Sequence, residues 1–175
     1  MKTITGTLAL LLLLAGFAVA CNGDDDSDGT PTAPTTPSTT ATASSSPTPS
    51  VEDEVEAAYL NYWDVYSDAV YNLDSSHLSQ VMTGPRLDRA IDEVNDLLQQ
   101  GRAVEIDVVN SPAVIQVDGS SAVLLDEYEN SSRFIDPQTK EPLSSPAEPQ
   151  TIRDTVTLNL IDGTWKVYDS VREAE

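Results

Sequence analysis

The sequence has almost none of the side chains on which disulfide, redox and metal chemistry depend. It contains one cysteine and one histidine in 175 residues. A single cysteine cannot form a disulfide within the chain, and one histidine gives no pair at the spacing typical of zinc sites. Glycine-rich phosphate-binding motifs are absent from the sequence as well. The sequence therefore predicts no metal site and no cofactor.

Basic residues are also scarce. Nine lysines and arginines stand against 29 aspartates and glutamates, which gives a formal net charge of −20. Residues 51–175 alone carry 25 acidic and eight basic side chains. Such a charge repels nucleic acid and anionic lipid surfaces, and it keeps a domain soluble. We therefore expect no nucleic acid among the partners of this protein.

The N-terminal apolar segment is too short to cross a membrane. The chain starts with Met1 and Lys2, and the apolar run from Leu8 to Ala20 has thirteen residues. A membrane-spanning helix needs ~20. A short positive start, an apolar core and small residues before a cleavage point are typical of a secretory signal peptide. Residues 1–20 are therefore predicted to be a signal peptide.

The only cysteine, Cys21, directly follows this segment. The sequence AVAC at residues 18–21 resembles the lipobox of bacterial lipoproteins, which implies that the cysteine is lipidated and becomes the first residue of the mature protein. The alternative is a secreted protein with a free cysteine, which leaves the position of the thiol unexplained. We expect a lipid on Cys21 that anchors the protein to the bacterial cell membrane on its extracytoplasmic side.

Residues 22–50 contain no aromatic residue and no leucine, isoleucine or valine. Threonine, serine, proline, aspartate and alanine make up most of this stretch. Such a composition cannot bury enough apolar surface to offset the entropy lost on ordering the chain. Residues 21–50 are therefore predicted to be the lipidated cysteine and a disordered tether, which is either a plain spacer or a stalk for O-linked sugars.

The domain that follows, residues 51–175, begins with patterns of helical period. Ser50 is a predicted N-cap, and acidic residues occupy the first turn of a helix of about twenty residues. A short helix is expected within residues 74–84, and a third from Pro85 to Gly101. The residues predicted to face the core are Val55, Tyr59, Tyr62, Trp63, Tyr66, Val70 and Leu73 in the first helix, and Leu87, Ile91, Val94 and Leu98 in the third.

From residue 102 onward the apolar period changes to two, which indicates strands. One strand is expected at residues 103–109, and two hairpins are expected to turn at Asp118–Gly119 and Asp162–Gly163. Residues 131–150 contain four prolines and few apolar residues, so they are predicted to be an exposed loop. Helices followed by an antiparallel sheet predict an α+β domain.

This order of elements resembles the nuclear transport factor 2-like (cystatin-like cone) superfamily. The resemblance covers residues 51–172 and rests on the aromatic-rich first helix and on the motifs LSQVMTGPRL, QQGRAVEIDV and GTWKVYDS. Residues 73–108 also resemble import-type domains found in a chloroplast-division protein and in bacterial extracytoplasmic lipoproteins. The resemblance implies a curved sheet that wraps the first helix and leaves a conical cavity. Some members are enzymes, such as ketosteroid isomerase and the polyketide cyclases, and many others are binding or dimerisation modules.

Two residues are candidates for acid–base chemistry in such a cone. His77, near the start of a helix, is more typically a surface or capping residue. Asp169 shares strand parity with Trp165 and Val167, which predicts that it faces an apolar interior where burial raises the pKa of its carboxyl group. The alternative for Asp169 is a carboxylate at a strand end that is exposed or bonded to a backbone amide.

The same reasoning gives candidate pocket residues. Tyr62, Tyr66, Trp165 and Asp169 are predicted to line a pocket if the cone is open. An aromatic stripe at helical spacing is otherwise typical of a closed core.

Two functions of different class remain at this point. The first is a non-catalytic binding or interaction domain, anchored by lipid outside the cytoplasmic membrane, which pairs with a protein partner or a second copy through its sheet face. The second is a small enzyme of isomerase or cyclase type. A tether positions a module near a membrane partner and adds little to the turnover of a diffusible metabolite, so the sequence favours the first.

Overall fold

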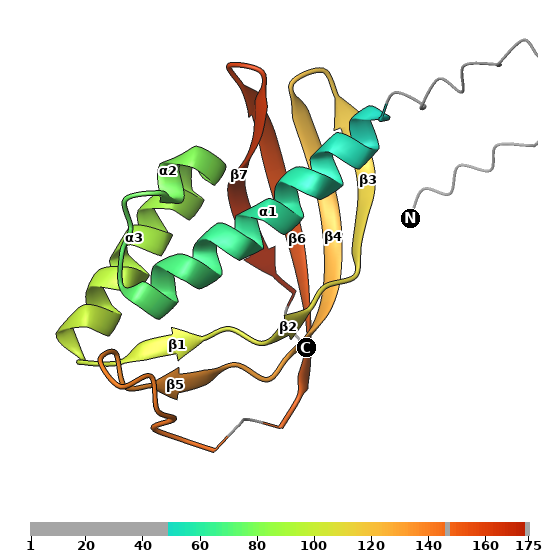
Figure 1. The fold of residues 1–175 in the computed structure, drawn as a ribbon. Coiled ribbons are helices and arrows are strands. Elements are labelled where there is room, and N and C mark those ends of the chain that lie inside the picture. The colour runs from blue at the N-terminus through green and yellow to red at the C-terminus, as the bar shows by residue number, and fades with distance from the viewer. Residues whose placement is uncertain (1–48, 146–147, 174–175) are drawn as a thin grey trace, which may run out of the picture. The chain divides into compact units, whose positions relative to one another are not determined.

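Three helices precede seven strands in the part of the chain that the computed structural model describes, residues 49–145 and 148–173 (Figure 1). The predicted signal peptide, Cys21 and all but the end of the predicted tether lie outside these residues. The elements are α1 (Val51–Asn72), α2 (Leu78–Val81), α3 (Gly84–Gln99), β1 (Ala103–Glu105), β2 (Val108–Val109), β3 (Pro112–Asp118), β4 (Ser121–Asn130), β5 (Arg133–Ile135), β6 (Gln150–Ile161) and β7 (Thr164–Arg172).

Helix α1 begins at the residue that the sequence predicts. The hydroxyl of Ser50 accepts a hydrogen bond from the backbone N–H of Asp53 at 3.1 Å, and the Asp53 carboxylate accepts one from the N–H of Ser50 at 3.0 Å. This reciprocal pair is a capping box, which satisfies two backbone donors that a helix start otherwise leaves open. The helix ends at Asn72 and is capped by Leu73, which has left-handed backbone geometry.

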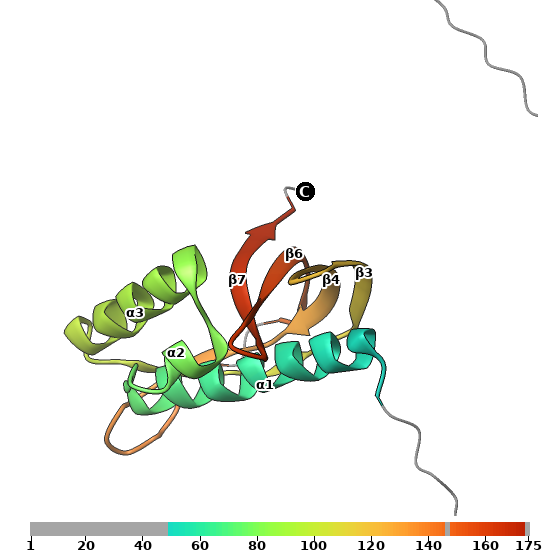
Figure 2. The same ribbon diagram turned by 90° about the horizontal axis from the view of Figure 1, so that it is seen from above.

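The main sheet is antiparallel and curves around α1 (Figure 2). Its strand order is β2–β4–β6–β7, and β3 also pairs with β4. The apolar core fills the space between α1 and the inner face of the sheet, where Leu124, Val156 and Leu158 are buried against Val55 and Tyr59. Helices on a curved antiparallel sheet confirm the predicted α+β cone.

The two predicted hairpins are present. Asp162 and Gly163 both have positive φ, 50° and 79°, which matches the two-residue turn that an Asp–Gly pair favours. The turn between β3 and β4 consists of Gly119 and Ser120, one residue later than predicted.

Two strand predictions are wrong. Residues 103–109 do not form one strand: β1 pairs with β5, whereas β2 pairs with β4. The predicted exposed loop at 131–150 contains β5, in which Ile135 is buried opposite Ala103. Local patterns do not reveal this pairing, because the two partners are about thirty residues apart and each contributes only three residues.

The buried face of α3 also differs from the prediction. Arg86, Ala90 and Val94 are its buried residues, whereas Leu98, predicted to face the core, is 58% exposed. The helix is rotated so that Arg86 faces α1, where its polar head finds hydrogen-bond partners. No helix among the described residues is both long and apolar enough to span a membrane.

Candidate functional site

A cavity of about 210 Å³ lies between α1, α3 and the inner face of β4, β6 and β7. Aromatic residues of α1 form one wall, and Tyr128 of β4 lies on the opposite side. Three arginines line the cavity, Arg86, Arg89 and Arg172, together with the carboxylates of Glu93 and Asp154. The cone is therefore open, and its lining is both aromatic and charged.

The start of α3 is fixed against β7 by a close backbone approach. The N–H of Thr83 donates to the carbonyl oxygen of Val167 at 2.9 Å. Gly84 has a φ of +55°, and a Cβ at this position would overlap the ring of Tyr168. Glycine meets both requirements, since it adopts positive φ without strain and leaves room for the ring. This contact sets the position of Arg86, two residues later.

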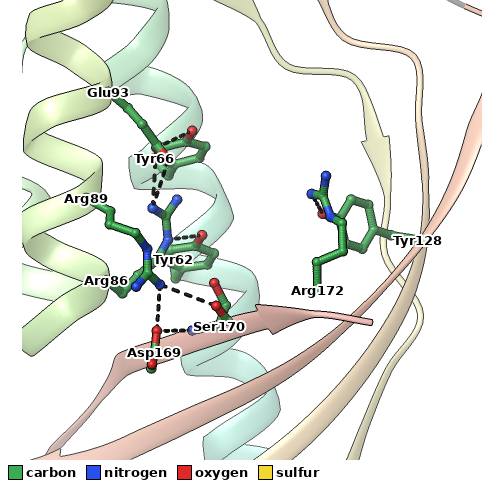
Figure 3. Close-up of polar contacts among 9 residues, drawn as sticks. All are labelled: Tyr62, Tyr66, Arg86, Arg89, Glu93, Tyr128, Asp169, Ser170 and Arg172. Atoms are coloured by element: carbon green, nitrogen blue, oxygen red, sulfur yellow. Dashed lines mark hydrogen bonds and ion pairs between the residues drawn. The ribbon is translucent and has the colours of Figure 1, made fainter. Parts of the chain in front are cut away.

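Arg86 is the buried charge of the site, with only 6% of its surface exposed. Its Nε donates to the hydroxyl of Tyr62 at 3.0 Å, and its Nη1 lies 3.3 Å from the carboxylate of Glu93 (Figure 3). The guanidinium also lies over the ring of Tyr66, 4.7 Å from its centroid, a cation–π geometry. These contacts compensate for the removal of the charge from water.

The tyrosines of this group remain protonated near neutral pH. Burial is the main cause that raises the pKa of Tyr62 and of Tyr66, and the nearby Glu93 carboxylate raises both further. The Tyr66 hydroxyl donates to Glu93 at 2.8 Å. Neither hydroxyl is therefore suited to act as a base, and both serve as hydrogen-bonding groups.

A second polar group lies across the cavity from Arg86 (Figure 3). The hydroxyl of Tyr128 donates to Asp154 at 3.0 Å and accepts from Nη2 of Arg172 at 3.1 Å. Burial, reinforced by Asp154, raises the pKa of Tyr128 to about 12. Arg172 is well exposed at its side chain, so this group forms an accessible side of the cavity.

Asp169 does not face the cone interior, because β7 contains a bulge. Thr157 and Leu158 of β6 are opposite Asp169 and Val167, so Tyr168 is an extra residue in β7. The bulge shifts the side-chain alternation by one position. Ser170 therefore falls in the inner row opposite Val156 and lines the cavity, which the predicted parity assigned to Asp169.

The prediction of a raised pKa for Asp169 is wrong. Its carboxylate forms an ion pair with Arg89 at 2.6 Å and accepts from the backbone N–H of Ser170 at 2.9 Å. The hydrogen bond from Arg89, supported by the one from Ser170, lowers the pKa of Asp169. Asp169 matches the alternative that the sequence left open, a carboxylate bonded to a backbone amide.

The other predicted residues divide between the cavity and the rest of the fold. Tyr62 and Tyr66 line the cavity, as predicted. Trp165 is buried in the apolar core and is not among the cavity-lining residues. His77 is exposed at the start of α2, where its Nδ1 lies 3.0 Å from Nε2 of Gln80, and it does not line the cavity.

Sequence reasoning missed the most deeply buried carboxylate. Asp126 of β4 is fully buried and accepts three hydrogen bonds, from the Tyr59 hydroxyl at 2.8 Å, Asn110 Nδ2 at 2.7 Å and the Ser111 N–H at 2.7 Å. These bonds attach the connection between β2 and β3 to α1. The sequence did contain a signal for this burial, because Asp126 alternates with Leu124 and Tyr128 and so shares the inward face of the strand.

Arg86 was missed as well. Arg86 precedes Ala90 by four residues and Val94 by eight, and this helical spacing places the arginine on the buried face of α3.

No group of three or more histidine, cysteine, aspartate or glutamate side chains that could hold a metal occurs within residues 49–145 and 148–173.

Solved structures share this fold. The intermembrane space region of the chloroplast protein ARC6 superimposes with a TM-score of 0.54 at 18% identity, over 69% of this chain and 94% of that one. A ketosteroid isomerase-like protein from Erwinia carotovora atroseptica matches at 15% identity and a TM-score of 0.45, over 71% and 97% of the two chains. An NTF2-like protein from Cytophaga hutchinsonii matches at 17% identity and a TM-score of 0.46, over 69% and 98%.

At sequence identities below 20%, the likeness to these structures shows a shared fold and nothing about function. No family model matches the sequence, and no curated protein does either. The fold that the chain shares with the ARC6 region is the α+β arrangement that the sequence predicted, with helices on a curved antiparallel sheet.

Proposed function

We propose that this nuclear transport factor 2-like domain is a ligand-binding module, in which the cone cavity holds a small organic molecule and a lipid on Cys21 anchors the chain outside the cytoplasmic membrane. The observation that supports binding is the open cavity of about 210 Å³ with its aromatic and arginine lining. Pockets for drug-sized ligands measure ~300–1,000 Å³, so the ligand is smaller than these.

The alternative is a cone-pocket enzyme of isomerase or cyclase type. Such an enzyme needs a base beside the substrate. The two candidates from the sequence do not supply one, because Asp169 is paired with Arg89 and His77 lies away from the cavity. Binding without turnover therefore has the better support.

Filling the cavity is expected to abolish ligand binding. Ser170→Phe projects a ring into the cavity, whereas Val171→Phe, at the next position, points to the outer face of the sheet. A ligand at ten times its Kd stabilises a protein by about 1.4 kcal/mol. Thermal unfolding of the full chain with a set of small organic molecules should show stabilisation of the wild type and of Val171→Phe.

Loss of this stabilisation in folded Ser170→Phe supports the cavity as the site. Equal stabilisation of all three proteins places the ligand elsewhere, and no stabilisation of the wild type by any molecule contradicts the proposal.

Cys21→Ala is expected to release the protein from the membrane. A lipid chain contributes about 0.8 kcal/mol per buried CH₂, and two chains give stable anchoring. In a bacterium that processes lipoproteins, the variant should incorporate no labelled palmitate and should leave the membrane pellet, whereas the matched tether variant Ser27→Ala should behave as the wild type does. Palmitate labelling of Cys21→Ala would contradict the anchor.

The sheet face remains a predicted surface for a protein partner or a second copy. On its outer side Ala113, Leu125, Thr155 and Val171 form one cross-strand row, and Val171 is largely exposed. Three of these four side chains are apolar, and an exposed apolar surface of this kind is typical of protein interfaces.

A further inference from the structure

Several side-chain N–H and O–H donors that line the cavity have no hydrogen-bond partner among the described residues. Arg86 uses Nε and Nη1 in its bonds to Tyr62 and Glu93, and no hydrogen bond to its Nη2 occurs among the described residues. Because Arg86 is 94% buried and lines the cavity, the surface that Nη2 retains is in the cavity. This N–H group is therefore available to an acceptor of a ligand in the cavity.

Other lining residues add to the donors. Asn130 accepts at Oδ1 from the N–H of Ser132, and within residues 49–145 and 148–173 its Nδ2 and the Ser170 hydroxyl have no hydrogen-bond partner.

The two carboxylates of the cavity, in contrast, already accept hydrogen bonds from arginine and tyrosine side chains of the lining. Both oxygens of Glu93 accept from Arg86, and one also accepts from Tyr66. The two oxygens of Asp154 accept from Tyr128 and Arg172. Both carboxylates are thus already paired with an arginine, whereas Arg86 Nη2, Asn130 Nδ2 and the Ser170 hydroxyl have no partner among the described residues, so the lining favours a ligand with acceptors.

The distribution of charge in the domain also favours a ligand that accepts hydrogen bonds and is negatively charged. Residues 51–175 have a net charge of −17, and only six of them are arginines. Three of these six line this one cavity. With the carboxylates of Glu93 and Asp154, the lining has a formal charge of +1 in a domain of −17, so a negative group is repelled less there than on the acidic surface.

We propose that the ligand of the cone is a small organic carboxylate with a flat apolar body. This inference rests on the proposed function and specifies its ligand class. The carboxylate accepts hydrogen bonds from Arg86 Nη2, Asn130 Nδ2 and the Ser170 hydroxyl, while the body packs on the aromatic rings of α1. The flat body distinguishes this ligand from inorganic phosphate, which makes no use of the aromatic wall.

Isothermal titration of the full chain in mild detergent with three probes tests the proposal. Benzoate has the required charge and ring, benzamide is its neutral isostere, and inorganic phosphate has charge without a ring. Hydrogen bonds to a charged group contribute more than those to a neutral one, so benzoate should bind at least about tenfold more tightly than benzamide. It should also bind more tightly than phosphate.

The outcomes separate this inference from the proposed function. Equal binding of benzoate and benzamide overturns the carboxylate and leaves a small-molecule cavity. Tighter binding of phosphate overturns the organic ligand. If neither these probes nor any small organic molecule binds, both the inference and the proposed function fail.

Two variants locate the site. Arg86→Gln removes the buried charge and should weaken benzoate binding at least about tenfold. The matched control Arg153→Gln removes an exposed arginine that pairs with Glu127 outside the cavity, and it should bind benzoate as the wild type does.

Asn130→Asp provides a test that does not depend on the stability of Arg86→Gln. It preserves the side-chain shape and the acceptor for the Ser132 N–H, and it places a negative charge in the cavity. Benzoate binding should fall at least about tenfold and benzamide binding should change little. Unchanged benzoate binding in Asn130→Asp overturns the proposal.

Discussion

Asp126→Ala is expected to lower the free energy of unfolding by about 3–5 kcal/mol. The change removes both acceptor oxygens from a fully buried site. It leaves the Tyr59 hydroxyl, the Asn110 amide and the Ser111 N–H without their partner. The Tyr59 hydroxyl is buried and the other two donors are partly buried, and a buried donor that loses its partner costs roughly 1–3 kcal/mol. Because a domain of this size is stable by only ~5–15 kcal/mol, the loss is a large part of the total.

Urea denaturation of the full chain measures this effect. Both tryptophans, Trp63 and Trp165, lie in the described domain, so their fluorescence reports its unfolding alone. Tyr59→Phe is the matched control, since it removes one donor together with its bond and should cost only about 1 kcal/mol. A loss below about 1 kcal/mol in Asp126→Ala, with an unchanged denaturant slope, would show that the three bonds do not stabilise the fold.

The domain is expected to unfold cooperatively at alkaline pH, with a midpoint at roughly pH 11–12. Burial raises the pKa of four tyrosines above its usual value near 10, those of Tyr59, Tyr62, Tyr66 and Tyr128. The folded state therefore retains these four protons at a pH at which the unfolded chain releases them. Their stabilising contribution is complete below pH 10 and is lost as the pH rises toward the folded-state values.

The size of the effect follows from the number of protons. Each such group lowers the free energy of unfolding by up to ~1.4 kcal/mol per pH unit, so four together lower it by about 5. Four of the six phenolates of the chain should form in the same transition as the change in tryptophan fluorescence. Tyr66→Phe should reduce the slope by about a quarter. Formation of more than two phenolates near pH 10 with native fluorescence would mean that the four tyrosines are accessible to solvent in the folded state.

The sequence predicts well what depends on local chemistry. The capping box at Ser50, the aromatic face of α1 and the Asp–Gly turn at 162–163 each depend on a few neighbouring residues. The order of helices and strands then restricts the fold, which is why the α+β cone was predictable.

What the sequence did not predict depends on contacts between distant segments. The β1–β5 pairing joins residues about thirty positions apart, and the polar residues Arg86 and Asp126 are buried only because partners from other elements satisfy them. An arginine or aspartate in an alternating or helical pattern is ordinarily taken as exposed. Tyr62 and Tyr66 were correctly placed at the cavity because their spacing of four puts them on one face of the same helix.

The extra residue in β7 has a consequence for how such a cavity can change. Upstream of Tyr168 the inner row contains Val167, and downstream it contains Ser170, with Asp169 turned outward to Arg89. If Tyr168 instead paired regularly opposite Thr157, without the bulge, Asp169 would fall opposite Val156 in the inner row in place of Ser170. The bulge thus decides whether a hydroxyl or a carboxylate faces the cavity. The preference for the sign of a ligand's charge can therefore diverge between related chains through the presence or absence of a bulge, without any substitution in the lining.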